Sequence, residues 1–157
     1  MSFFPSQQLK TILSAAQLLT LNSVPVVLVP GKSGCLIELQ SLYFRYIHGT
    51  TQFNPGSNDV ISVYFGPTVS SNPAAARITP LTAPGFVDQT VDASMWGPPS
   101  WGGNGNGNIP FTLSSYIGTG ISINQWDTGG SFPTGTDWTQ GNGSLAVFVK
   151  YAYVEVS

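Results

Sequence analysis

The stretch SLAVFVKYAYVEV, residues 144–156, decides the fold class. Two apolar sets alternate along it: Leu145, Val147, Val149, Tyr151 and Tyr153 on one side, and Ala146, Phe148, Lys150, Ala152 and Val154 on the other. Apolar residues on both sides of a strand predict burial on both faces. The Asn142-Gly143 pair just before it is typical of a tight turn. Residues 144–156 are therefore expected to form a central strand of a β-sandwich.

Shorter apolar runs between turn residues predict further strands over residues 24–29, 35–46, 60–65, 86–87, 91–96, 109–113 and 118–123. Pro25 makes the first of these an edge strand or a strand start, because proline cannot donate to a ladder. Within residues 35–46 the apolar set changes sides near Gln40 and Ser41, which predicts a bulge. Roughly seven or eight strands are typical of a jelly roll. We therefore expect an all-β, jelly-roll-like antiparallel sandwich.

Residues 1–22 differ from the remainder of the chain. Ser6 is a candidate cap for a short helix that would place Leu9, Ile12, Leu13 and Ala16 on one face. That helix would pack on its own domain, or it would form an arm along a neighbouring subunit. Residues 23–157 are expected to form a single β-sandwich domain, with long irregular loops over 66–110 and 124–143.

Charge is scarce in this chain. Only 12 of 157 residues are Asp, Glu, Lys or Arg, against about a quarter in ordinary domains. The five basic residues are scattered, which argues against nucleic-acid binding, and no run of about 20 apolar residues predicts a membrane span. The lone Cys35 is expected to be a buried thiol. The N-terminus lacks a secretory signal pattern, so we expect a soluble protein made inside a cell.

Candidate catalytic groups are few. His48 and Cys35 lack the sequence context of a nucleophile and its base. The carboxylate pairs Asp88 with Asp92 and Asp127 with Asp137 lie in loop-like segments, where Asp is an ordinary turn residue. No catalytic residue, cofactor or metal site is predicted, and the chain is expected not to be an enzyme.

The four tryptophans, Trp96, Trp101, Trp126 and Trp138, lie in or beside glycine-rich irregular segments. Exposed aromatic side chains in such segments suit protein interfaces and sugar stacking. Alternatively, the rings close the ends of the sandwich, because most aromatic residues are buried. Both interpretations remain open from the sequence.

Two stretches resemble small β-sandwich structural proteins of tailed bacteriophages. They are LTLNSVPVVLVPGKSGCLI (residues 19–37), followed by the aromatic strand to Tyr46 and GTT at 49–51, and TQGNGSLAVFVKY (139–151). Capsid decoration (cement) proteins are the closest match in size and organisation. The resemblance implies a jelly roll, usually trimeric, that clamps major-capsid subunits from outside. Residues 66–138 have no counterpart in it.

The sequence thus predicts a non-enzymatic decoration protein on the capsid exterior, synthesised in the host cytoplasm. Its expected partners are the major capsid protein and further copies of itself in a homotrimer. The expected contact residues are Phe3, Phe4, Leu9, Ile12, Trp96, Trp101, Trp126 and Trp138. The alternative is a phage tail or fibre module that recognises host glycan through the loop tryptophans.

Overall fold

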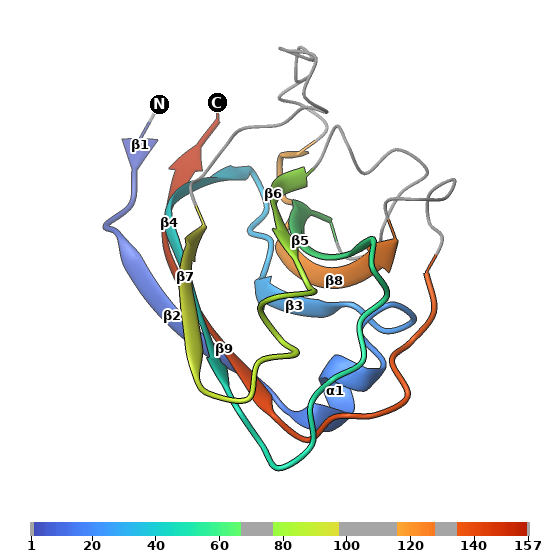
Figure 1. Ribbon diagram of the computed structural model, residues 1–157. Coiled ribbons are helices and arrows are strands. Elements are labelled where there is room, and N and C mark those ends of the chain that lie inside the picture. Colours follow the sequence, from blue (N-terminus) through green and yellow to red (C-terminus); the bar gives the residue numbers. More distant parts are fainter. Residues whose placement is uncertain (1, 67–76, 98–115, 128–134, 157) are drawn as a thin grey trace.

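The structure, a computed structural model, describes residues 2–66, 77–97, 116–127 and 135–156. Two antiparallel sheets face each other (Figure 1). The first contains β1 (Ser2–Phe3) and β2 (Gln7–Leu13), both paired to β9 (Ser144–Glu155), then β4 (Cys35–Ile47) and β7 (Ala93–Gly97). The second has the order β3 (Val26–Val29), β8 (Ile121–Asp127), β5 (Asp59–Phe65) and β6 (Arg77–Thr82).

The strand pairing is nested in the way that defines a jelly roll. β5 pairs with β6, β4 with β7, β3 with β8 and β2 with β9, and successive pairs belong to alternate sheets. The chain therefore folds as one long hairpin rolled into two layers. This confirms the predicted all-β, jelly-roll-like sandwich. As expected, β9 is a central strand and β3 is an edge strand.

The core lies between the two sheets. β4 and β9 contribute fully buried side chains such as Phe44, Leu145 and Val147. Ile61 and Ile123 of the second sheet belong to the same core. Each such side chain contributes about 1.5–3 kcal/mol when it leaves water. Cys35 is also in this core as a free thiol, as predicted.

The predicted bulge is present in β4, where the register to β9 shifts between Leu39 and Ser41. Before it, odd-numbered residues such as Ile37 and Leu39 face the core, whereas after it the even-numbered Leu42 and Phe44 do so. The extra residue lets both halves of the strand bury their apolar side chains. It also leaves Ser41 and Tyr43 on the outer face of the first sheet.

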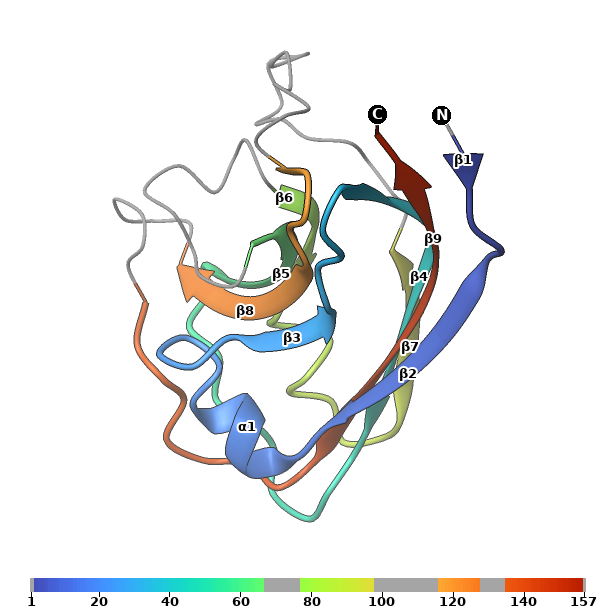
Figure 2. The ribbon, with the colours of Figure 1, turned by 180° about the vertical axis from the view of Figure 1, so that it is seen from behind.

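The N-terminal helix was predicted in the wrong place. Residues 7–13 form β2, which pairs with β9 from Gln7↔Tyr151 to Leu13↔Leu145. The only helix among the described residues, α1 (Ala15–Leu19), begins after Ser14, which forms a capping box with Gln17. The ladder of β9 offers seven consecutive partners to residues 7–13, and this pairing outweighs a weak helical pattern. The segment packs on its own domain (Figure 2).

Other expectations also changed. Residues 86–87 lie in a turn, since the amides of Phe86 and Val87 both donate to the carbonyl of Ala83. Residues 109–113 are outside the described part of the chain. The strand predicted over 118–123 is β8, which continues through the polar residues to Asp127, and β6 was missed.

Candidate functional site

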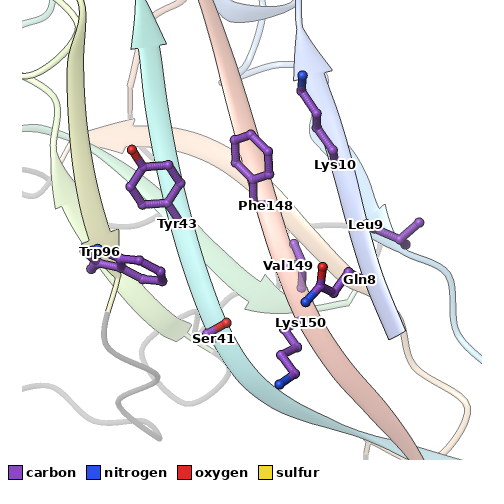
Figure 3. Close-up of a pocket in the computed structure, with 9 residues that line it drawn as sticks. All are labelled: Gln8, Leu9, Lys10, Ser41, Tyr43, Trp96, Phe148, Val149 and Lys150. Atoms are coloured by element: carbon purple, nitrogen blue, oxygen red, sulfur yellow. The ribbon is translucent and has the colours of Figure 1, made fainter. Parts of the chain in front are cut away.

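A row of four side chains crosses the outer face of the first sheet, one each from β2, β9, β4 and β7. Lys10 on β2 pairs in register with Phe148 on β9, Phe148 with Tyr43 on β4, and Tyr43 with Trp96 on β7. Side chains in register on neighbouring strands lie side by side. We call these residues the aromatic row; Figure 3 shows them projecting from four adjacent strands.

The aromatic row is continuous. The ring centres of Tyr43 and Trp96 are 4.9 Å apart, and those of Tyr43 and Phe148 are 5.6 Å apart, with the rings tilted by 49° and 50°. The Lys10 ammonium lies 5.5 Å from the centre of the Phe148 ring. Each contact of these kinds stabilises the pair of side chains by about 0.5–1.5 kcal/mol. The row is thus an ordered surface although Trp96 is 69% exposed.

A polar row runs beside the aromatic row. It consists of Gln8, Lys150 and Ser41, which are in register on β2, β9 and β4. The two rows line a groove with a volume of about 540 Å³. Lys10 and Lys150 are the charged residues in its lining. Among the described residues neither lysine forms an ion pair, and Glu38, the only carboxylate of β4, instead accepts a hydrogen bond from Gln40.

The tryptophans divide into two kinds. Trp96 is exposed on β7, whereas Trp126 and Trp138 are buried. The Trp126 indole Nε1 donates to Ser62 Oγ at 2.7 Å, and the Trp138 Nε1 donates to Asp59 Oδ2 at 2.7 Å. Trp138 belongs to the hydrophobic core, whereas Trp126 is buried beside Ser62 on the face of the second sheet opposite the core. Neither ring is exposed, in contrast to their prediction as contact residues. Trp101 lies outside the described residues.

The predicted N-terminal contact residues also divide. Ile12 is 54% and Leu9 37% exposed on β2, and Leu9 points away from the aromatic row in Figure 3. Phe4 is half-buried beneath Lys32, whose ammonium lies 3.5 Å from the ring centre. Phe3 is described only in its backbone, which pairs with Val154.

The groups considered for catalysis have structural partners. Asp92 pairs with Arg45 at 3.3 Å and accepts the amide of His48, and Asp88 accepts the amide of Gly85 within a turn. The pKa values shifted upwards belong to tyrosines outside the groove. Burial, followed by the negative charges of Asp88 and Asp92, raises the pKa of Tyr46, and burial raises the pKa of Tyr64 to about 12.

A second hollow, of about 610 Å³, is lined by Asp59, Asp127 and Asp137. Asp59 accepts hydrogen bonds from the amide of Gly56 and from the Trp138 indole, and Asp137 accepts the amide and hydroxyl of Ser23. These bonds fix the loops before β3 and β5. Over the described ranges, no three His, Cys, Asp or Glu side chains gather closely enough to hold a metal ion.

Comparison of the chain with protein-family models, with curated proteins and with solved structures finds no match to any of them. In the described part of the chain, no helix combines the length and the apolar character needed to cross a membrane.

Sequence reasoning missed most of the groove. It singled out Trp96 but not Tyr43, Phe148 or Lys10, because it treated each strand separately. The signal was present in the alternation of residues 144–156, where Phe148 and Lys150 share a side. Only the register between strands brings this side next to Tyr43 and Trp96.

Proposed function

We propose that the chain is a non-enzymatic decoration (cement) protein that binds the outside of a phage major-capsid lattice as a homotrimer and stabilises the shell. The observation that supports this proposal is the outer edge of β2. Among the described residues β2 pairs with β9 alone, so its other edge faces no strand. Beside that edge the side chains of Leu9 and Ile12 are exposed on opposite faces of β2.

An open strand edge is a ready template for another chain, and monomeric proteins usually protect it. Here one lysine, Lys10, is the only charge along Gln7–Leu13. Docking of this edge against a capsid subunit would bury Ile12 and satisfy main-chain groups. A protein that binds the assembled shell but not the separate subunits stabilises the shell by mass action. The resemblance of residues 19–37 and 139–151 to phage sandwich proteins points to the same partner.

The proposal is tested with capsids that lack this protein. Adding the purified chain is expected to raise the melting temperature of the shell, and Ile12→Lys is expected to abolish most of the gain by placing a charge in the contact. Val24→Lys is the matched control, because Val24 is similarly exposed, at 59%, but lies outside β2. No binding to shells, or equal losses in the two variants, would contradict the proposal.

A tail or fibre module that recognises host glycan is the second candidate, and the exposure of Trp96 favours it. Electron microscopy of the virion distinguishes the two. Hundreds of copies on the shell support decoration, whereas a few copies at the tail support the second candidate. Sedimentation of the purified chain tests the trimer independently.

A further inference from the structure

The groove on the first sheet has two chemically different sides. One side is the aromatic row, with the rings of Phe148, Tyr43 and Trp96, and the other is the polar row of Gln8, Lys150 and Ser41. A ligand that fits both sides has an apolar face next to a hydrogen-bonding edge. A pyranose ring has this form, since its C–H face stacks on aromatic rings while its hydroxyl groups point outward.

The charges in the groove further restrict the chemical class of the ligand. Lys10 stands at one end of the aromatic row and Lys150 in the middle of the polar row. Neither forms an ion pair among the described residues. Two unpaired cations without a carboxylate in the lining complement an anionic ligand, because opposite charges across a binding surface favour association.

The backbone argues against a peptide in this place. An extended peptide usually binds a sheet by adding a strand to a free edge. The middle of the groove lies on β9 and β4, and each of these strands already pairs on both sides, β9 with β2 and β4, and β4 with β9 and β7. A ligand there must be held by side chains alone. The volume of about 540 Å³ also falls in the range of roughly 300–1,000 Å³ that is typical of small-ligand sites.

We propose that this groove binds an acidic oligosaccharide, whose sugar rings stack on Trp96, Tyr43 and Phe148 while its anionic groups face Lys10 and Lys150. The site does not depend on the decoration function. The two surfaces meet at β2, whose Gln8, Leu9 and Lys10 line the groove. The rings that would hold the saccharide lie on β9, β4 and β7, whereas the shell contact would use the open main-chain edge of β2.

The test is calorimetric titration of the purified full chain with three acidic probes: hexagalacturonate, sialyllactose and a heparin hexasaccharide. Cellohexaose serves as the neutral probe and hexaglutamate as the acidic peptide probe. At least one acidic saccharide is expected to bind in the micromolar to millimolar range, more tightly than cellohexaose and hexaglutamate. Its affinity is expected to fall as salt is raised, because the lysines are exposed.

Trp96→Ala is expected to weaken that binding by roughly two- to tenfold, the size of one aromatic contact. Its matched control is Met95→Ala, the neighbouring exposed residue of β7, which is absent from the groove lining. The double variant Lys10→Gln/Lys150→Gln is expected to remove most of the salt dependence. Lys32→Gln is its control, because Lys32 also lies over a ring, that of Phe4, but outside the groove.

Three results would overturn the proposal: no acidic saccharide binds below about 1 mM, Trp96→Ala binds as the unmodified chain does, or hexaglutamate binds as tightly as the saccharides. The last result would make the groove a protein-docking site. Shell binding is measured separately with Trp96→Ala as well as Ile12→Lys, because Ile12 shares a face of β2 with Lys10 whereas Trp96 lies on β7. A Trp96→Ala chain that still binds shells but not saccharide separates the two proposals.

Discussion

The outer faces of the two sheets invert the usual distribution of side chains. On the first sheet the outer face presents Trp96, Tyr43 and Phe148, with the tryptophan 69% exposed. On the second sheet the face opposite the core carries polar side chains that are almost fully buried: Ser62 at 3%, Asn124 at 2% and Ser122 at 1% exposure. The outer face of the second sheet is therefore already covered, whereas the outer face of the first sheet still exposes apolar surface.

The buried polar face combines a specific bond with hydroxyls that have no hydrogen-bond partner over the residues that the structure describes, those of Ser122 and Tyr64. The Trp126 indole donates to Ser62, and Val60↔Trp126 and Ser62↔Asn124 are neighbouring cross-strand pairs of β5 and β8. A buried polar group costs stability unless it is bonded, so the Trp126–Ser62 bond stabilises this face whereas the hydroxyls of Ser122 and Tyr64 reduce its stability. Within the described ranges the aromatic row carries no buried polar bond of this kind, and its exposed Trp96 ring is available for a ligand.

The largest effect is expected from exchanging the two sides of β4. Insertion of an alanine between Leu42 and Tyr43 moves Phe44 and Tyr46 to the outer face and turns Tyr43 inward, because a one-residue shift reverses every later side chain. We expect the chain to lose cooperative thermal unfolding. Deletion of Gln40 instead removes the extra residue of the bulge and keeps the sides of Tyr43 and Phe44, so it is expected to fold. Equal stability of the insertion and deletion variants would contradict the assignment.

A smaller effect separates the tryptophans of the two faces. Trp126→Ala removes a buried ring and the bond to Ser62, which is expected to lower the free energy of unfolding by about 3–5 kcal/mol. Trp96→Ala is expected to change it by less than about 1 kcal/mol, because the ring is exposed and loses only its contact with Tyr43. Chemical denaturation of both variants measures the difference. Similar losses would show that the two faces are equally structural.

These contrasts mark the limit of what the sequence predicts. The alternation in residues 144–156 and the change of sides near Gln40 were sufficient for the sandwich, the central strand and the bulge. β2 was not predicted because the spacing of Leu9, Ile12 and Leu13 fits a helix as well as a strand. Only the pairing with β9 favours the strand. The end of β8 was not predicted because Asn124 and Gln125 are polar residues that become buried only in the folded protein.

The groove was not predicted from the sequence for a related reason. Its residues come from four strands that are far apart in sequence, and no single strand contains its pattern. The burial of Trp126 and Trp138 depends on partners as distant as Ser62 and Asp59. Local sequence patterns therefore could not separate these rings from Trp96.

The smallest effect concerns Tyr64, which is buried on the second sheet and whose hydroxyl has no partner among the described residues. Its pKa is raised to about 12 by burial, so the unfolded chain releases this proton first as pH rises above 10. The free energy of unfolding is therefore expected to fall between pH 10 and 12, by up to roughly 2–3 kcal/mol from this group. Tyr64→Phe is expected to lack this part of the fall and to equal or exceed the unmodified stability at pH 7. Identical pH profiles would contradict the burial.

The most direct test of the central claim, that the ligand face is the aromatic row, observes the indole N–H signals by nuclear magnetic resonance. The signals of Trp96, Trp126 and Trp138 are assigned from the corresponding single variants, and the acidic saccharide that binds most tightly is then titrated. The Trp96 signal is expected to shift in a saturable way while those of Trp126 and Trp138 stay in place. A Trp96 signal that does not move while a saccharide binds would contradict this claim.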